Sequence, residues 1–248
     1  MTLPPATLSE ADGVRYLHLG TEWVQGAMQI RAPNQVELEY VQRMLVWLLW
    51  RAESEWSHGR AVQLGLGAGA LTRFCYRVLH MKTTAVELNP AVIGVARLWF
   101  HLPADNDRLL VVEADAARWV ADPAHLQSAH VLNVDLYDHE AASPVLDDEA
   151  FYAACRGVLA EGGLMTVNLF GRHASFDASL ECIAAAFGPD RVWHLAPTRE
   201  GNTIVVAARD VRLPERGIQL QRADIIESRF KLPARRWPRL IKPHIVSG

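Results

Sequence analysis

The chain has 248 residues and half of them are apolar, which is enough for one sizeable α/β domain with small appendages. Its formal net charge of −3 gives no general attraction to nucleic acid. The longest apolar stretch, Met44 to Trp50, is far shorter than the roughly 18 residues that a membrane span needs, and the N-terminus shows no basic-then-apolar leader, so neither membrane insertion nor secretion is expected.

The cysteines and histidines show no metal-binding pattern. Cys75, Cys155 and Cys182 fall inside predicted helices, without the spacing of a metal site or of a disulfide framework. The histidines are scattered, with no pair at metal-ligand spacing. We therefore expect no bound metal and a reducing, cytoplasmic environment.

The first 33 residues predict a short β-hairpin. Residues 1–12 are expected to be loose, because prolines and small polar residues dominate them. Residues 14–19 alternate apolar and polar side chains, which is typical of a half-buried strand. Residues 22–30 form the expected return strand, with a bulge at Gly26.

Residues 34–210 predict the main domain, in which strands and helices alternate. Its first helix is expected to run from Asn34 to about Arg51, with Asn34 and Glu37 forming a capping box. A later helix opens at Pro90 and is expected to bury Val92, Val95, Ala96 and Trp99. Strands are predicted at Ala61–Leu64, Thr83–Val86, Leu109–Val112, His130–Val134, Leu164–Leu169, Arg191–Leu195 and Thr203–Ala208.

Helices between these strands are predicted over residues 71–79, 149–159 and 176–187, and Glu161–Gly163 is expected to form a helix end followed by a turn. This alternation, closed by two strands in sequence, indicates a Rossmann-like, doubly wound and mostly parallel sheet with an antiparallel terminal strand pair.

Residues 211–248 predict a basic arm interrupted by prolines. It holds nine lysines and arginines against three acids, and only Arg222–Phe230 has the pattern of a helix. Two roles remain open: a solvated surface arm that Trp237 and Leu240 pack on the domain, or a contact for an acidic partner or a second subunit.

Three glycines between the first strand of the main domain and the helix that follows it, residues 71–79, indicate a nucleotide-binding loop. Gly65, Gly67 and Gly69 allow a sharp turn and let a ligand approach the backbone. An ordinary strand-to-helix turn is the alternative. Glu87 follows the next strand, 18 to 22 residues after these glycines, where a doubly wound fold places the acid that binds a ribose.

Two further acids follow the next two strands. Asp115 comes after the third predicted strand and Asp135 after the fourth. Because the carboxyl ends of parallel strands meet at one edge of the sheet, these acids predict a ligand-binding crevice there.

The order of these motifs resembles the spermidine synthase family, the polyamine aminopropyltransferases, whose core is that of class I S-adenosylmethionine methyltransferases. The Gly-Gly-Gly-Asp-Gly-Gly loop of the family matches residues 65–70, and its ribose-binding acid matches Glu87. Its Asp-Gly pair beside the adenine matches Asp115-Ala116, and its Asp-x-x-Asp loop matches residues 135–138.

The resemblance implies roles for individual residues. Asp135 takes the place of the general base and Asp138 that of a partner that holds the amine. Gln25 matches a glutamine of the family's N-terminal hairpin, and Tyr137 could pack on the methylenes of a substrate or on the helix below. The implied donor is decarboxylated S-adenosylmethionine or S-adenosylmethionine, the implied partner is a small amine, and a homodimer is compatible with the family.

Two departures leave the activity open. Ala68 stands where the family has the aspartate that grips the ammonium of the aminopropyl donor. Arg199 stands where it has a tyrosine on the polyamine side, and a fixed cation there would repel a cationic substrate. Three functions are therefore retained: an aminopropyltransferase, an S-adenosylmethionine-dependent methyltransferase, and a catalytically degenerate nucleoside-binding protein.

Overall fold

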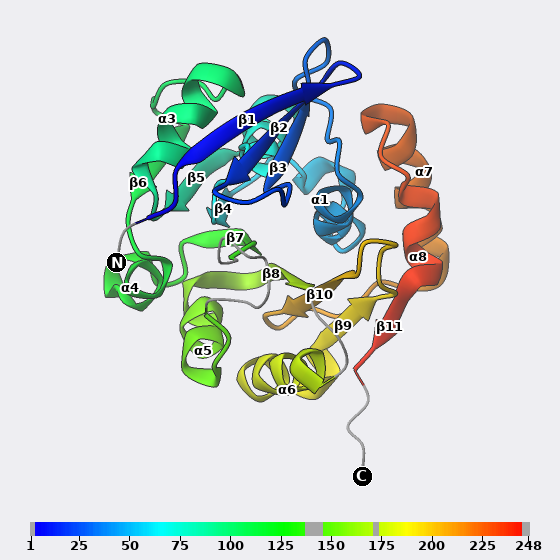
Figure 1. The fold of residues 1–248 in the computed structure, drawn as a ribbon. Coiled ribbons are helices and arrows are strands. Elements are labelled where there is room, and N and C mark those ends of the chain that lie inside the picture. Colours follow the sequence, from blue (N-terminus) through cyan, green and yellow to red (C-terminus); the bar gives the residue numbers. More distant parts are fainter. Residues whose placement is uncertain (1–2, 137–145, 171–173, 245–248) are drawn as a thin grey trace.

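The computed structural model describes residues 3–136, 146–170 and 174–244, which form an α/β fold around a central sheet (Figure 1). In these residues eight strands form that sheet, in the order β11-β9-β10-β8-β7-β4-β5-β6. Their bounds are β4 (Arg60–Leu64), β5 (Lys82–Glu87), β6 (Leu109–Glu113), β7 (Ala129–Val134), β8 (Leu159–Phe170), β9 (Val192–Leu195), β10 (Asn202–Ala208) and β11 (Ile241–Pro243).

Strands β8, β7, β4, β5 and β6 are parallel to one another, whereas β10, β9 and β11 continue the sheet in antiparallel pairs. The predicted mostly parallel sheet with an antiparallel end is thereby confirmed. The sequence did not predict β11, which adds one more antiparallel strand to that end.

Helices cover both faces of the sheet (Figure 1). One apolar cluster joins one face to α1, η1, α2, η3 and α7, and a second joins the other face to α4, α5 and α6. The helical bounds are α1 (Glu39–Met44), η1 (Leu45–Leu49), α2 (Ala70–Arg73), η3 (Phe74–Val78, a π-helical segment), α3 (Pro90–Trp99), α4 (Ala116–Ala121), α5 (Glu149–Val158), α6 (Ala174–Phe187), α7 (Arg216–Phe230) and α8 (Trp237–Leu240). Short 3-10 turns lie at Glu53–Glu55, Pro123–His125, Pro189–Arg191 and Ala234–Arg236. No helix in the described ranges has the length and hydropathy to cross a bilayer.

The N-terminal segment forms a three-stranded antiparallel sheet of β1 (Ala6–Ala11), β2 (Val14–Leu19) and β3 (Gly26–Gln29). The expectation of a loose N-terminus was wrong for residues 6–11, which pair with β2 through a two-residue hairpin turn in which Asp12 and Gly13 both adopt positive φ. Residues 1–2 lie outside the described residues. The return strand is shorter than predicted, since only residues 26–29 pair with β2.

The first helix of the main domain begins later than the sequence predicted. Helix α1 starts at Glu39 and its N-cap, Leu38, offers no side-chain hydrogen bond. The predicted capping box of Asn34 and Glu37 is absent because a carboxylate oxygen of Glu37 instead accepts a hydrogen bond from Gln29 Nε2 at 2.8 Å. The chain then continues as the 3-10 helix η1, all of whose residues are buried.

Helix α3 begins as expected, with Asn89 Oδ1 accepting a hydrogen bond from the N–H of Ala91 at 3.0 Å. The expectation that Trp99 is buried was wrong: the residue is 48% exposed. The guanidinium of Arg15 lies over the Trp99 ring, 5.3 Å from its centre. The indole therefore packs against a cation rather than against the apolar core.

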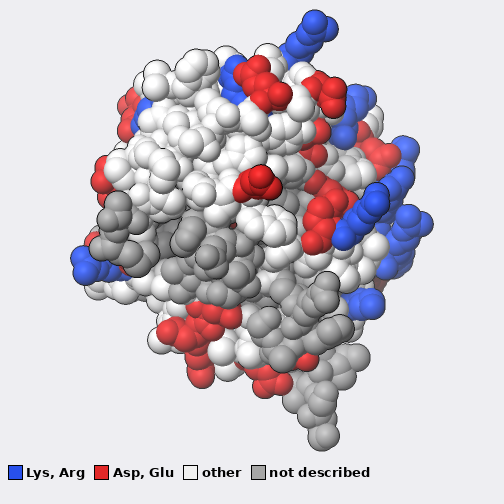
Figure 2. All heavy atoms as spheres, viewed as in Figure 1, with Lys and Arg blue, Asp and Glu red and all other residues white. Residues whose placement is uncertain are grey.

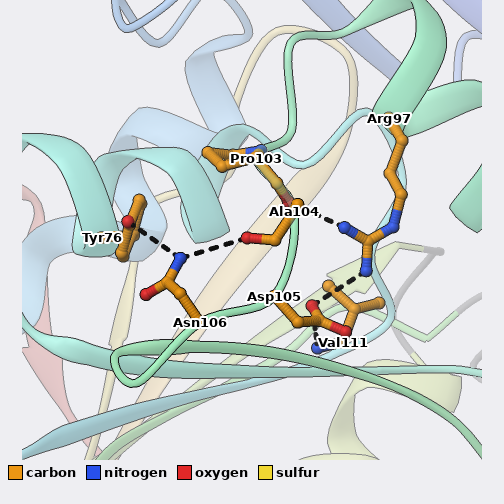
Figure 3. A network of polar contacts seen from close by, with 7 residues as sticks. All are labelled: Tyr76, Arg97, Pro103, Ala104, Asp105, Asn106 and Val111. Carbon is orange, nitrogen blue, oxygen red and sulfur yellow. Dashed lines mark hydrogen bonds and ion pairs between the residues drawn. The ribbon is translucent and has the colours of Figure 1, made fainter.

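A polar network holds the loop between α3 and β6 (Figure 3). Arg97 donates hydrogen bonds to Asp105 Oδ1 and to the carbonyl of Pro103, each at 2.8 Å. Asn106 Nδ2 donates to the hydroxyl of Tyr76 at 3.0 Å, which ties the loop to η3. These bonds fix the start of β6 and hence the strand that leads to Asp115.

Strand β8 begins five residues earlier than predicted, directly after α5. Residues 161–163, expected to form a helix end and a turn, lie inside β8. The reason is pairing with Arg209, the residue directly after β10: Gly162 N–H donates to Arg209 O at 3.0 Å and Arg209 N–H donates to Gly163 O at 2.9 Å.

The basic C-terminal segment packs as a continuation of the fold. Helix α7 starts at Arg216 rather than at Arg222, and Trp237 is buried as expected. Figure 2 shows lysine and arginine side chains gathered on the side where α7 and α8 lie, with acidic side chains among them. Arg222 donates to Leu49 O at 2.8 Å, and Arg235 pairs with Asp224 at 2.6 Å. Some of the arginines of this segment therefore form hydrogen bonds or ion pairs within the chain.

Candidate active site

The glycine loop connects β4 to α2 by a sharp turn, as the sequence predicted. Gly65 and Gly69 have φ of 82° and 70°, and Gly69 is the N-cap of α2. A Cβ atom on Gly65 would lie 2.1 Å from the carbonyl oxygen of Asp135, which no side chain can occupy. The glycine therefore lets the ends of β4 and β7 approach, and Asp135 N–H donates to Leu64 O at 3.0 Å across them.

Glu87 is the last residue of β5, and its side chain forms a hydrogen bond with the glycine loop. Its carboxylate accepts hydrogen bonds from the N–H of Leu66 at 2.9 Å and the N–H of Asn89 at 2.8 Å. Burial raises the pKa of Glu87, and the backbone N–H groups of Leu66, Asn89 and Leu88 oppose that rise. A carboxylate has about four lone-pair positions, so acceptor capacity is left for a ligand hydroxyl.

Asp115 stands between β6 and α4 and forms the N-cap of that helix. Its Oδ1 accepts a hydrogen bond from Arg118 N–H at 2.9 Å. Asp115 and the following Ala116 line the same cavity as Glu87.

Asp135 follows β7 and is held by two side chains. Asn168 Nδ2 donates to its Oδ1 at 2.9 Å, and the hydroxyl of Tyr40 donates to its Oδ2 at 3.3 Å. Burial raises the pKa of Asp135, while the hydrogen bonds from Asn168 and Tyr40 counteract the rise. A carboxyl group with a raised pKa is a better proton acceptor than an exposed aspartate.

The orientation of the Asn168 side chain is fixed by a hydrogen bond from β10, in the antiparallel part of the sheet. Asn202 Nδ2 donates to Asn168 Oδ1 at 3.1 Å, which leaves the Nδ2 group of Asn168 to face Asp135. Asn202 is in turn held by Thr198, whose Oγ1 accepts from its N–H at 3.1 Å. The sequence did not predict this chain of contacts, although a polar residue near the carboxyl end of an apolar strand was a signal for Asn168.

A cavity of about 550 Å³ opens at the carboxyl ends of the parallel strands. Five carboxylates line it: Glu22, Glu87, Asp115, Asp135 and Glu200. Among the lining residues in the part of the chain that the structure describes, none is a lysine, an arginine or a histidine. Such a cavity attracts cations and disfavours anions.

Apolar side chains surround the mouth of the cavity. Trp23 is 57% exposed, Leu88 is 49% exposed, and both line the cavity with Val24. The N-terminal segment closes another side, where Asn89 Nδ2 donates to Pro4 O at 2.9 Å. The mouth can therefore contact the apolar part of a ligand while the acids bind its polar groups.

The structure brings most of the sequence-predicted site residues together. The cavity is lined by Gln25, Gly65, Gly67, Glu87, Asp115, Ala116 and Asp135. Gly69 caps α2 and is not part of the wall, and Arg199 is exposed outside it, whereas its neighbour Glu200 lines the cavity. Tyr137 and Asp138 lie outside the described residues. Nowhere in the described ranges do three metal-ligating side chains form a group.

No family model matches the chain.

Several solved structures are similar in fold. A probable spermidine synthase from Corynebacterium glutamicum aligns with a TM-score of 0.74 at 21% identity, over 90% of this chain and 82% of that one. Human methyltransferase-like protein 13 in complex with SAH aligns with a TM-score of 0.69 at 20% identity, over 79% of this chain and 93% of that one. These likenesses show the Rossmann-like methyltransferase fold.

Closer relatives are found among curated proteins. The polyamine aminopropyltransferase of Chromobacterium violaceum is 32% identical over 232 residues, which are 93% of this chain and 86% of the relative. That of Neisseria meningitidis serogroup B is 31% identical over 205 residues, 82% of this chain and 76% of the relative. The chain therefore belongs to the polyamine aminopropyltransferase family.

Proposed function

We propose that the protein transfers an aminopropyl group from decarboxylated S-adenosylmethionine to a small amine. The observation that carries the proposal is Asp135, a half-buried carboxylate with a raised pKa that lines a cavity whose described charged residues are all acids. The curated relatives, named polyamine aminopropyltransferases, support the same reaction.

The chemistry needs a neutral amine and a positioned acceptor for its proton. The amine nitrogen attacks the propyl carbon next to the sulfonium, a C–N bond forms, and the C–S bond breaks to leave methylthioadenosine. In the proposal Asp135 takes the proton that the amine gives up. Asn168 and Tyr40 keep its carboxylate pointed into the cavity, and since a sulfonium is a good leaving group, orientation supplies much of the rate.

The nucleoside half of the donor is proposed to bind along the glycine loop. Glu87 would accept hydrogen bonds from the ribose hydroxyls, because its two backbone hydrogen bonds leave acceptor capacity. Asp115 and Ala116 would contact the adenine, and Gly65 and Gly67 would let the nucleoside approach the backbone.

The proposed roles of Gln25 and Asp138 toward the amine rest on the family resemblance, and that of Tyr137 rests on its position between Asp135 and Asp138 in the sequence. Gln25 lines the cavity. For Arg199 the structure supports no direct contact with a substrate in the cavity, since the residue is exposed outside its walls.

Methyl transfer is the second candidate, favoured by Ala68, which removes the family's ammonium-binding carboxylate. It would require the carboxylate of S-adenosylmethionine to enter a cavity with five acids in its described wall and no described cation. The like-charge repulsion favours the decarboxylated donor. The third candidate, a catalytically degenerate nucleoside binder, predicts binding without turnover.

Asp135→Asn tests the proposal. The variant should lose nearly all aminopropyl transfer, because an amide cannot accept the proton, while methylthioadenosine still binds along the glycine loop. Asp190→Asn is the matched control, since Asp190 is exposed and pairs only with Arg191 among the described ion pairs. Turnover of Asp135→Asn within a few-fold of the wild type would refute Asp135 as the base.

We further propose a reducing, cytoplasmic setting, which three free cysteines suit, and a homodimer. Sedimentation velocity of the purified protein measures the oligomeric state directly.

A further inference from the structure

A small hollow of about 20 Å³ adjoins the main cavity, and residues of the glycine loop form part of its wall. The two share part of their walls, namely Gln25, Tyr40, Gly67 and Asp135 together with Leu38. The hollow is also lined by Ala68 of the loop and by Gln63 of β4. It is large enough for one water-sized group, and it lies directly beside the carboxylate of Asp135.

Two amide side chains on the wall of this hollow each have one unpaired polar atom. Gln63 is only 4% exposed, and its Oε1 has no hydrogen-bond partner among the described residues. Gln25 Nε2 is buried and equally without a partner within the described part of the chain. Unpaired buried polar atoms cost free energy, so two of them on one hollow indicate a polar occupant.

The chemistry of the walls narrows the class of occupant. Gln63 Oε1, the carboxylate of Asp135 and the hydroxyl oxygen of Tyr40 can all accept hydrogen bonds, and no described lining residue is cationic. The terminal amide of Gln25 can turn to present its oxygen as well. An ammonium has three donors and no acceptor, which suits these groups. A carboxylate would meet further acceptors, and a methyl group would leave Gln63 unpaired.

We propose that this hollow binds the terminal ammonium of the aminopropyl chain and that Gln63 is the residue that selects it. In this assignment Ala68, a small residue, lines the hollow, and the amide oxygen of Gln63 on β4 accepts a hydrogen bond from the ammonium. The inference rests on the proposed aminopropyl transfer, because it assigns one end of that donor.

Calorimetry on the full chain separates the ammonium end of the donor from the nucleoside end. The probes are decarboxylated S-adenosylmethionine, which carries the ammonium, and methylthioadenosine, which lacks it. Gln63→Met keeps the length of the side chain and removes its polar atoms. It is expected to weaken binding of the decarboxylated donor about tenfold or more and to leave methylthioadenosine within about twofold.

Gln63→Glu retains an acceptor at the same reach and should bind the decarboxylated donor at least about ten times more tightly than Gln63→Met. Gln221→Met, at an exposed position on α7, is the matched control and should bind both probes as the wild type does. Equal losses for both probes in Gln63→Met, or equal donor affinity in the Met and Glu variants, would overturn the assignment.

Turnover distinguishes this inference from the proposed function. If the wild type transfers the aminopropyl group while Gln63→Met binds the donor normally, the hollow is wrongly assigned and the function stands. If the selective loss in Gln63→Met is found in a wild type without turnover, the ammonium site stands and the transferase activity is refuted.

Discussion

Gly65→Ala tests whether the close approach of β4 and β7 builds the site. Gly65 has a φ of 82°, a left-handed conformation that costs a non-glycine residue roughly 1–2 kcal/mol. The added Cβ would lie 2.1 Å from the carbonyl oxygen of Asp135, whereas real contacts stay above 3.0 Å. The oxygen belongs to the backbone and the position of a Cβ atom is fixed by the backbone, so no side-chain rotation can relieve the clash.

Relief requires the two strand ends to separate. That movement weakens the hydrogen bond from Asp135 N–H to Leu64 O, which contributes about 1 kcal/mol, and overpacking adds about 1–3 kcal/mol. With the backbone strain included, the free energy of unfolding should fall by about 3–6 kcal/mol. For a chain of this length the melting temperature should then drop by roughly 6–24 °C.

Gly162→Ala is the matched control for Gly65→Ala. Gly162 has a φ of 72° and nothing lies within 4 Å of an added Cβ, so only the backbone strain applies. Differential scanning fluorimetry should show a drop of only a few degrees for this variant, and calorimetry should show methylthioadenosine binding retained in Gly162→Ala and lost in Gly65→Ala. Equal drops in melting temperature, with ligand binding intact in both, would refute the reasoning.

Three further predictions concern the pKa of Asp135, its hydrogen bond from Asn168, and Gly94 in α3. Because burial raises the pKa of Asp135 and only the ionised form accepts a proton, kcat/KM should fall as the pH drops through that raised pKa; an acid limb in the ordinary range of aspartate would contradict this. Asn168→Ala removes a hydrogen bond that lowers the pKa of Asp135, so it should shift this acid limb to still higher pH and reduce kcat about tenfold; an unmoved limb would argue against the contact. Gly94→Ala, inside α3 with nothing within 4 Å of the added Cβ, should stabilise the protein by about 0.5–1 kcal/mol in chemical denaturation, and a destabilised variant would show that α3 is misplaced.

Residue pattern was sufficient to predict the nucleoside half of the site. Glu87 ends a strand of the parallel sheet, Asp115 and Asp135 come just after two others, and parallel strands end at the same edge. Three acids at equivalent positions therefore had to converge once the strands were assigned correctly. The turn at Gly65 was predictable for a similar reason, since glycine is the residue that tolerates its φ.

The groups that orient Asp135 were beyond such reasoning. Tyr40 comes from α1 and Asn168 from β8, so their meeting depends on how a helix packs over the sheet. Gln63 looked like an ordinary strand residue, and only the packing of the hollow shows its oxygen to be unpaired. Likewise the capping box predicted at Asn34 failed because a distant side chain, Gln29, binds Glu37.

The most direct test of the central claim is product formation by the wild type. The protein is incubated with decarboxylated S-adenosylmethionine and a panel of di- and polyamines, and products are quantified by mass spectrometry. We predict methylthioadenosine and an aminopropylated amine in equal amounts, each dependent on both substrates. Absence of both products, or a methylated acceptor formed from S-adenosylmethionine instead, would contradict the assignment.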